Sequence, residues 1–156
     1  MNTELRQLHE AVLDLIGLFN QPQRDIVLIK EAGISIDRAL FPLLVRIERR
    51  GPLGIVELAD LAGRDHTTVS RQVTKLESLG LVTRRASQND GRVSEVAATK
   101  KGKSMTNALD AARERLAWPI LAQWNEKDRK DLIRLLRKFV DDALTFTSHT
   151  QSKKVS

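Results

Sequence analysis

Residues 58–92 read LADLAGRDHTTVSRQVTKLESLGLVTRRASQNDGR, and this stretch decides the fold. Its middle predicts the helix His66–Ser78, because Asp65 is a good N-cap and Gly80 can end a helix in the left-handed conformation. A shorter helix within 53–62, after a brief extended piece, comes before it and ends at a glycine. Two helices joined by a tight glycine-containing turn form a helix-turn-helix.

A hairpin is predicted directly after the second helix. Residues 81–85 and 93–98 are short strand candidates. The polar loop 86–92 between them contains Asn89-Asp90-Gly91, a sequence that favours a turn. A hairpin in this position is a wing, so the stretch as a whole predicts a winged helix-turn-helix.

The N-terminal segment predicts a helix with a narrow apolar seam, of the kind that packs against a partner helix. The seam consists of Leu5, Leu8, Val12, Leu15 and Phe19. Residues 20–33 begin with a break and then turn apolar, which leaves their structure open. Ser35 is a good N-cap for a helix over 35–50, in which Pro42 predicts a kink.

The C-terminal segment predicts two more helices. Thr99 is the expected N-cap of a long helix with a kink at Pro119, and Asn125 is the expected cap of the last helix. The last helix has a broad apolar face formed by Leu132, Leu135, Leu136, Phe139, Val140, Ala143 and Leu144. Residues after about Thr147 are polar and predict a flexible tail.

These elements predict a mostly α fold with a small β wing. The apolar faces at both ends of the chain exceed what one small lobe can cover, which predicts a homodimer. The expected divisions are 1–34 for the N-terminal dimerisation helix and linker, 35–100 for the winged helix-turn-helix lobe (the winged lobe), 101–147 for the C-terminal dimerisation helices and 148–156 for the flexible tail.

The positive charge of the chain is concentrated in one segment. The formal net charge of the 156 residues is +6, and residues 64–103 hold nine Lys or Arg against four Asp or Glu. The rest of the chain is therefore almost neutral. A basic footprint confined to one segment is what binding to phosphate requires, although a solvated basic face has the same composition.

The outer face of the helix His66–Ser78 is short, polar and basic, which suits a helix laid in the major groove of duplex DNA. Candidates for contacts to base edges are Thr67, Thr68, Ser70 and Arg71. Candidates for base or phosphate contacts are His66, Thr74 and Lys75, and the expected DNA-binding set also includes Arg64, Arg84 and Arg85. The alternative is an ordinary surface helix.

The wing contributes two further candidates. Arg92 near its tip is expected to reach the minor groove, whose negative potential attracts a guanidinium. Asp90 can accept hydrogen bonds from that guanidinium and hold it in a fixed pose. The alternative is a plain turn with a solvated salt bridge, which contributes little stability.

A series of short motifs runs through this part of the chain: Leu58-Ala59, Leu61-Ala62-Gly63, Thr68-Val69-Ser70-Arg71, Leu76-Glu77, Gly80-Leu81-Val82, Arg84-Arg85, Asp90-Gly91-Arg92 and Thr99-Lys100-Lys101-Gly102. In their order and spacing they resemble the multiple antibiotic resistance regulators, the MarR family, and the resemblance covers nearly the whole chain. Pro42 and Pro119 depart from it, because the family's helices are often continuous at these places.

The resemblance implies a dimer made by the first and last two helices, and a wing whose Asp90 and Arg92 match the family's wing pair. It also implies regulation of transcription, often repression, relieved by a small-molecule effector bound between the dimer region and the DNA-binding lobe. A dimer predicts a pseudo-palindromic operator in duplex DNA, with half-site centres ~10 bp apart.

Composition argues against several other classes. The chain has no cysteine, which excludes a thiolate metal site and a thiol redox switch. No apolar run reaches the ~18 residues of a membrane span and no signal sequence is visible, so we expect a cytoplasmic protein without membrane association. His9, His66 and His149 are far apart in the sequence, and no Glu or Cys lies near them at the spacing of metal ligands. We therefore expect a protein that binds no metal or cofactor and is not an enzyme.

Two binding alternatives remain beside duplex DNA. Single-strand binding needs exposed aromatic side chains for stacking, and residues 42–117 contain none. A winged helix used as a protein-interaction module, without specific DNA readout, is disfavoured by the charge but stays open. The residues Phe19, Phe41, Trp118 and Trp124 are candidates for a ligand pocket, although aromatic side chains on apolar helix faces are more often plain core.

Overall fold

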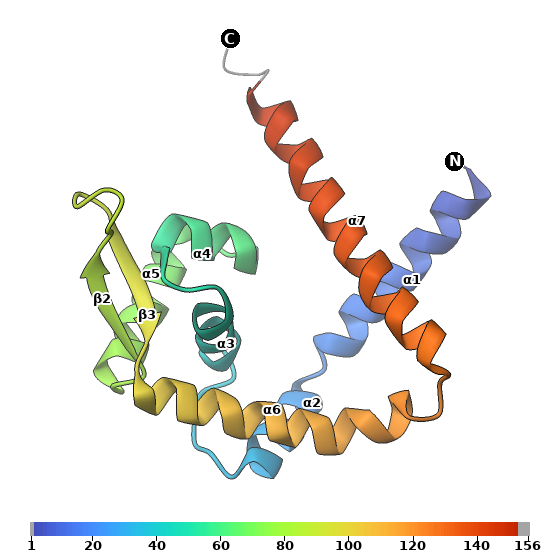
Figure 1. Cartoon of the computed structure of the whole chain (residues 1–156), viewed down its shortest axis with the longest axis horizontal. Helices are drawn as coiled ribbons and strands as arrows, with labels where there is room; N and C mark the ends of the chain where they lie inside the picture. Colours follow the sequence, from blue (N-terminus) through green and yellow to red (C-terminus); the bar gives the residue numbers. More distant parts are fainter. Residues whose placement is uncertain (1, 153–156) are drawn as a thin grey trace. The chain divides into compact units, whose positions relative to one another are not determined.

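The computed structural model describes residues 2–152, with the side chains of residues 2–147. In this range the chain forms seven helices and three strands (Figure 1). The elements are α1 (Thr3–Phe19), α2 (Pro22–Ala32), α3 (Phe41–Arg50), β1 (Leu53–Gly54), α4 (Ile55–Ala62), α5 (His66–Ser78), β2 (Val82–Ala86), β3 (Ser94–Ala98), α6 (Lys100–Leu121) and α7 (Glu126–Ser152). The chain divides into two compact units, Met1–Glu114 and Arg115–Ser156.

The predicted helix-turn-helix is present. α4 ends at Ala62 and is followed by the C-cap Gly63, whose φ is 63°. α5 begins after Asp65, whose carboxylate accepts a hydrogen bond from the N–H of Thr68. Beyond the other end of α5, Gly80 has a φ of 73°. Glycine takes this left-handed conformation without a steric penalty, which is why it ends helices so often. Local signals therefore place both ends of α5 where the sequence predicted them.

The three strands form one antiparallel sheet in the order β1-β3-β2. β2 pairs with β3 from Val82 opposite Ala98 to Ala86 opposite Ser94. The loop 87–93 between them is the wing, seen at the upper left of Figure 1. The predicted hairpin is confirmed, with each strand beginning one residue later than expected.

The core of the winged lobe lies among α3, α4, α5 and the sheet. Its largest fully buried side chains are Leu43, Leu44, Ile47, Leu53, Leu58, Val69, Val73, Leu76, Leu81 and Val96. A second cluster joins α2, α3 and α6 through Leu28, Phe41, Val45, Leu109 and Ala112. Burying each such side chain contributes ~1.5–3 kcal/mol relative to exposure, so packing fixes the inner face of α5 firmly.

The helix predicted over 35–50 is shorter, because α3 begins only at Phe41. Pro42 therefore lies in the first turn, where its missing N–H would have had no helical partner, and the expected kink is wrong. Ser35 lies outside the helix and is not its N-cap. The open segment 20–33 contains α2, which likewise has a proline in its first turn.

The second unit contains the end of α6 and the whole of α7. Pro119 lies inside α6, near its C-terminal end. The predicted cap of α7 is confirmed, since the side-chain oxygen of Asn125 accepts the N–H of Asp128 at 2.7 Å. α7 continues to Ser152, beyond the predicted end of the helix, and residues 153–156 of the expected tail lie outside the described residues.

Among residues 2–152 we find no helix with the length and hydrophobicity that a membrane span requires.

Candidate nucleic-acid interface

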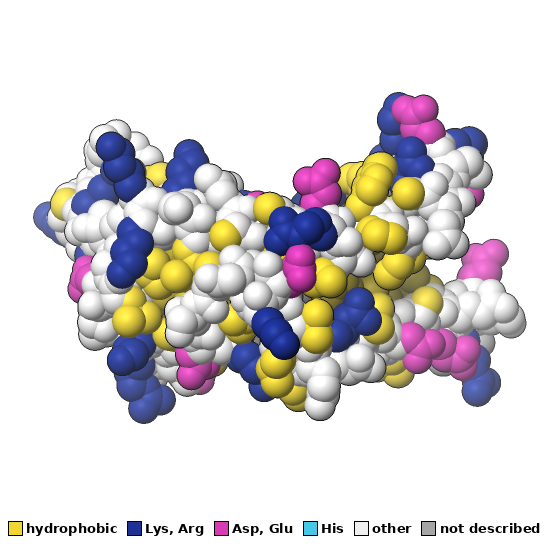
Figure 2. Space-filling view, turned by 90° about the horizontal axis from the view of Figure 1, so that it is seen from below, with side chains coloured by type: hydrophobic (Ala, Val, Ile, Leu, Met, Phe, Trp, Pro, Cys, Tyr) yellow, Lys and Arg dark blue, Asp and Glu magenta, His cyan; other side chains and the backbone are white. Residues whose placement is uncertain are grey.

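α5 has one buried face and one exposed face. The buried face consists of Val69, Val73 and Leu76, and the exposed face includes Thr67, Arg71, Thr74 and Lys75. Figure 2 shows the side of the molecule that faces down in Figure 1, and Lys and Arg predominate over Asp and Glu on its left-hand part. Because packing holds the inner face, a side chain at position 71 or 75 extends from a rigid support.

Asp65 and Thr68 lock the first turn of α5. The Asp65 carboxylate accepts the N–H of Thr68 at 2.8 Å and also accepts the hydroxyl of Thr68. These bonds, the hydroxyl first, hold the pKa of Asp65 below its usual value. The hydroxyl of Thr68, a predicted base contact, is thus already paired within the turn. Thr67 and His66 are exposed at the same end, where Nε2 of His66 lies 3.4 Å from Oδ1 of Asp60.

Arg64, another predicted DNA contact, makes hydrogen bonds within the winged lobe. Its guanidinium donates to the carbonyl of Ala39 at 2.9 Å and to the side-chain oxygen of Gln72 at 3.0 Å. Arg64 also affects a neighbouring arginine: burial lowers the pKa of Arg46 most, and the positive charges of Arg50 and Arg64 lower it further. Since Gln72 belongs to α5, Arg64 helps to fix that helix, and any phosphate contact by Arg64 competes with these two bonds.

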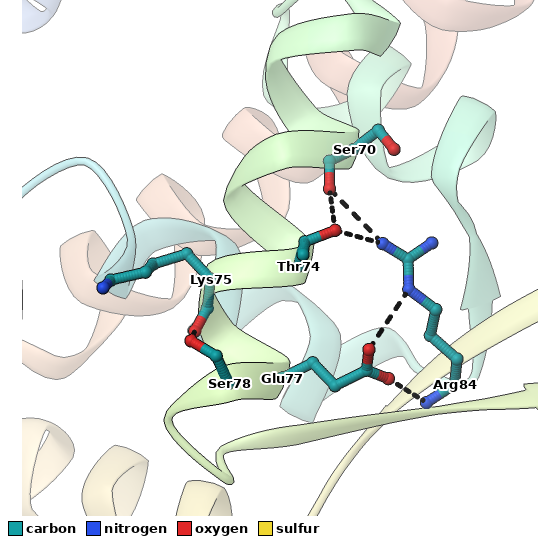
Figure 3. Close-up of polar contacts among 6 residues, drawn as sticks. All are labelled: Ser70, Thr74, Lys75, Glu77, Ser78 and Arg84. Atoms are coloured by element: carbon teal, nitrogen blue, oxygen red, sulfur yellow. Dashed lines mark hydrogen bonds and ion pairs between the residues drawn. The ribbon is translucent and has the colours of Figure 1, made fainter.

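Arg84 joins the wing strand β2 to α5 (Figure 3). Its guanidinium donates to the hydroxyl of Thr74 at 2.9 Å and to the carbonyl of Ser70 at 3.3 Å. Its Nε lies 3.8 Å from the carboxylate of Glu77, which also accepts the backbone N–H of Arg84 at 3.3 Å. The hydroxyl of Thr74 in turn donates to the carbonyl of Ser70 at 3.0 Å.

This network gives two predicted DNA contacts a second role. Arg84 is half-buried, and the hydroxyl of Thr74 has both a donor and an acceptor within the protein. Both side chains therefore fix α5 against the wing. Glu77 was missed at the sequence level, where its one signal was an isolated acid near the end of a basic helix.

A buried serine orders the wing. The hydroxyl of Ser87 accepts the N–H groups of Asn89 and Asp90 at 3.2 and 3.4 Å, and its own N–H donates to the carbonyl of Val93 at 2.8 Å. The carboxylate of Asp90 accepts the backbone N–H of Arg92 at 3.0 Å. This corrects the expected contact, because Asp90 holds the backbone of Arg92 rather than its guanidinium. The Arg92 side chain itself is exposed.

The exposed basic residues of the predicted set fall into two groups. Arg71 and Lys75 lie on α5, while Arg85 and Arg92 lie on the hairpin. Arg85 sits on β2 directly opposite Glu95 of β3. In the described part of the chain, no group of three or more His, Asp or Glu side chains could hold a metal ion. The arrangement offers guanidinium and ammonium groups to an anionic partner.

The four aromatic pocket candidates have different environments. Phe41 is buried in the cluster with Val45 and Leu109, which is the plain core role. Phe19, Trp118 and Trp124 are exposed, at 67%, 50% and 43% respectively. Their role in a ligand pocket stays a prediction.

Comparison with known proteins gives the family context of this surface. Residues 36–94 match the model of the MarR family. The uncharacterized HTH-type transcriptional regulator YxaD of Bacillus subtilis (strain 168) is 31% identical over 104 residues, which are 67% of this chain and 73% of YxaD.

Solved structures with the same fold cover almost the whole chain. The transcriptional regulator BldR of Sulfolobus solfataricus aligns with a TM-score of 0.70 and 22% identity, over 91% of this chain and 99% of BldR. The crystal structure of MarR aligns with a TM-score of 0.67 and 20% identity, over 96% and 98% of the two chains.

Proposed function

The chain belongs to the MarR family of transcriptional regulators, and from that premise we propose that it binds a specific site in duplex DNA, with α5 as the recognition helix in the major groove. The observation that carries the proposal is the exposed face of α5. Thr67, Arg71 and Lys75 project from a helix whose opposite face is fully buried. A rigid helix with short polar and long basic side chains can approach base edges closely and pair with guanine acceptors.

The wing adds a second contact in this proposal. Arg92 would enter the adjacent minor groove, where the focused negative potential attracts a guanidinium without base-specific hydrogen bonds. The hydrogen bonds of Ser87 and Asp90 within the loop support this role, because an ordered loop loses less conformational entropy on binding.

The regulator would act as a homodimer on a pseudo-palindromic operator. Leu5, Leu8 and Phe19 of α1 are exposed, and so are Leu135, Phe139 and Leu144 of α7. Apolar surface of this extent is typical of a face that a second protein covers. The residues 1–34 and 101–147 would form the dimerisation region, and 35–100 the DNA-binding lobe, as the sequence predicts.

Repression relieved by a small-molecule effector is the regulatory mode that we propose, on the strength of the family membership. Phe19, Trp118 and Trp124 are the exposed aromatic candidates for contacting such an effector. A regulator of this kind would act in the cytoplasm together with its operator.

The test is selection of duplex DNA from a random pool by the purified full-length protein. We expect enrichment of a pseudo-palindromic sequence, bound with an affinity that falls steeply as the salt concentration rises. A protein-interaction module without DNA readout is the alternative function. It would enrich no sequence and would show the same weak binding to every duplex.

A further inference from the structure

The C-terminal end of α5 is held by the first turn of α6. Three successive carbonyls after α5 each accept a hydrogen bond from that turn. The ammonium of Lys101 donates to Leu79 at 2.8 Å, the hydroxyl of Thr99 donates to Gly80 at 2.6 Å, and the N–H of Thr99 donates to Leu81 at 3.0 Å. The two helices therefore meet through a defined joint, which we call the α5–α6 joint (residues 79–81 and 99–102).

Gly102 allows this joint to close. A Cβ at this position would lie 2.1 Å from the carbonyl oxygen of Leu81, a separation that atoms do not adopt, and 3.3 Å from the side chain of Leu44. The N–H of Gly102 donates to the hydroxyl of Thr99 at 3.1 Å. The backbone of α6 thus lies against the backbone that follows α5, and neither can shift without disturbing the other.

Lys101 is an exposed member of the joint. Its side chain runs past Gly80, since a Cβ added there would lie 3.9 Å from Cδ of Lys101. The carbonyls at a helix C-terminus lack helical partners and carry partial negative charge, so an ammonium is favoured there. The side chain is therefore engaged with the end of α5, although it belongs to the basic segment that suggests phosphate binding.

We propose that Lys101 is a positioning residue for DNA recognition. It fixes the end of α5 to α6 and thereby sets the orientation in which Arg71 meets the bases, rather than neutralising a phosphate. The proposal rests on the proposed function of α5 as the recognition helix. A positioning residue changes the discrimination between sequences, whereas a phosphate contact changes the affinity for all sequences alike and the salt dependence of binding.

The first measurement needs no DNA. Lys101→Met removes the ammonium and keeps the apolar stem, and Lys100→Met is the matched control, since Lys100 is the adjacent exposed lysine on the same turn. Amide hydrogen exchange at Leu79, Gly80 and Leu81 should become about two- to fivefold faster in Lys101→Met and stay unchanged in the control. Unchanged exchange in Lys101→Met would overturn the proposal.

The second measurement compares binding to the selected operator and to a random duplex at several salt concentrations. Lys101→Met should lower the ratio of operator affinity to random-duplex affinity about two- to tenfold, while the salt dependence of binding stays unchanged. Lys101→Arg, which keeps a positive charge, should retain the wild-type ratio. Equal weakening on both duplexes with a flatter slope would identify a phosphate contact and overturn the proposal. If the wild-type protein bound no duplex at all, the proposed function would fail and this proposal with it, while the exchange data would still establish the joint.

Discussion

Arg71 and Lys75 lie one turn apart on the exposed face of α5, yet their replacement should have different effects. Arg71→Ala should relax the base preference at one position in each half-site and cost ~1–3 kcal/mol of operator binding. Lys75→Ala should weaken binding to every duplex and flatten the salt slope by about one unit, because an ammonium acts as a point charge on phosphate. Fluorescence anisotropy on operator and random duplexes measures both. Equal losses on the two duplexes for Arg71→Ala would contradict its base-reading role.

Arg84 and Arg85 are a second pair of neighbours with different surroundings. Arg84→Ala removes the hydrogen bonds to Thr74 and Ser70 and the contact with Glu77, so it should lower the free energy of unfolding by about 1–2 kcal/mol. Arg85→Ala, on the exposed side of β2, should change it by less than about 0.5 kcal/mol. Urea unfolding at constant salt distinguishes them, and equal stability of the two variants would refute the structural role of Arg84.

The hydroxyl residues of α5 show where sequence reasoning stops at the residue scale. Thr67, Thr68 and Thr74 are chemically alike and all lie near the expected DNA surface. The structure pairs Thr68 with Asp65 and Thr74 with Arg84, and the second contact spans ten residues. Helical periodicity predicts which side of a helix faces outward, but it does not predict a hydrogen bond to a side chain on a separate strand.

At the scale of the element, the helix ends that were predicted correctly are those with a clear local signal, as in α5, and the end that had to be corrected, the start of α3, lacks one. Both ends of α5 follow from an acidic N-cap and a left-handed glycine, each within three residues of the boundary. The predicted start of α3 was wrong, because a proline in an apolar stretch is compatible either with the first turn of a helix or with a kink inside one. Only the packing of Phe41 and Val45 in the second core cluster distinguishes these two arrangements.

The capping carboxylate predicts how stability depends on pH. The pKa of Asp65 is lower in the folded protein than its ordinary value of 3.8, so its contribution is complete above that value and is lost as the pH falls through the lowered folded-state pKa. Asp65→Ala should therefore melt at a lower temperature than the wild type near neutral pH, and the gap should close well below 3.8. Thermal unfolding followed by circular dichroism tests this.

A suitable control for that experiment is Asp14→Ala, which removes an exposed carboxylate from the middle of α1. The difference in melting temperature between Asp14→Ala and the wild type should not close below pH 3.8 in the way expected for Asp65→Ala. A gap for Asp65→Ala that stayed constant down to the lowest pH would rule out the ionised carboxylate as the source of the stabilisation.

The wing gives a prediction in which charge and geometry oppose each other. Asp90→Ala removes the acceptor for the backbone N–H of Arg92 and should weaken operator binding by about 1 kcal/mol, although it also removes a negative charge beside DNA. Asp90→Asn keeps an acceptor oxygen and removes the charge, so it should bind as tightly as the wild type or more tightly. Arg92→Ala should weaken binding more than Arg85→Ala. Tighter binding by Asp90→Ala at two salt concentrations would refute the ordering role of Asp90.

At the scale of the whole molecule, the exposed apolar side chains of α1 and α7 predict the state of assembly. The protein should sediment at twice 17.6 kDa at micromolar concentration. Phe139→Asp places a charge in the apolar face of α7 and should shift the protein toward monomer and abolish tight operator binding together. A wild-type monomer at micromolar concentration would remove the basis of the dimer.

The apolar faces could be predicted from their periodicity, because seven-residue patterns are visible within one helix. The division into compact units could not. The sequence placed a functional boundary at residue 100, whereas the contacts keep about two thirds of α6, residues 100–114, in the same compact unit as the winged lobe. Leu109 and Ala112 pack with Phe41 of α3, and Arg49 pairs with Asp110 at 2.6 Å. Contacts of such long sequence separation are absent from any local pattern.

The placement of Trp118 and Trp124 has a spectroscopic consequence. The chain has two tryptophans and no tyrosine, and both tryptophans belong to the second unit, where the guanidinium of Arg129 lies 5.4 Å from the ring of Trp118. Tryptophan fluorescence therefore originates in the second unit, and the winged lobe contributes no tryptophan of its own. A change in tryptophan emission when the operator is added would show that the surroundings of Trp118 or Trp124 respond to DNA binding, and it would be observed without attaching a dye.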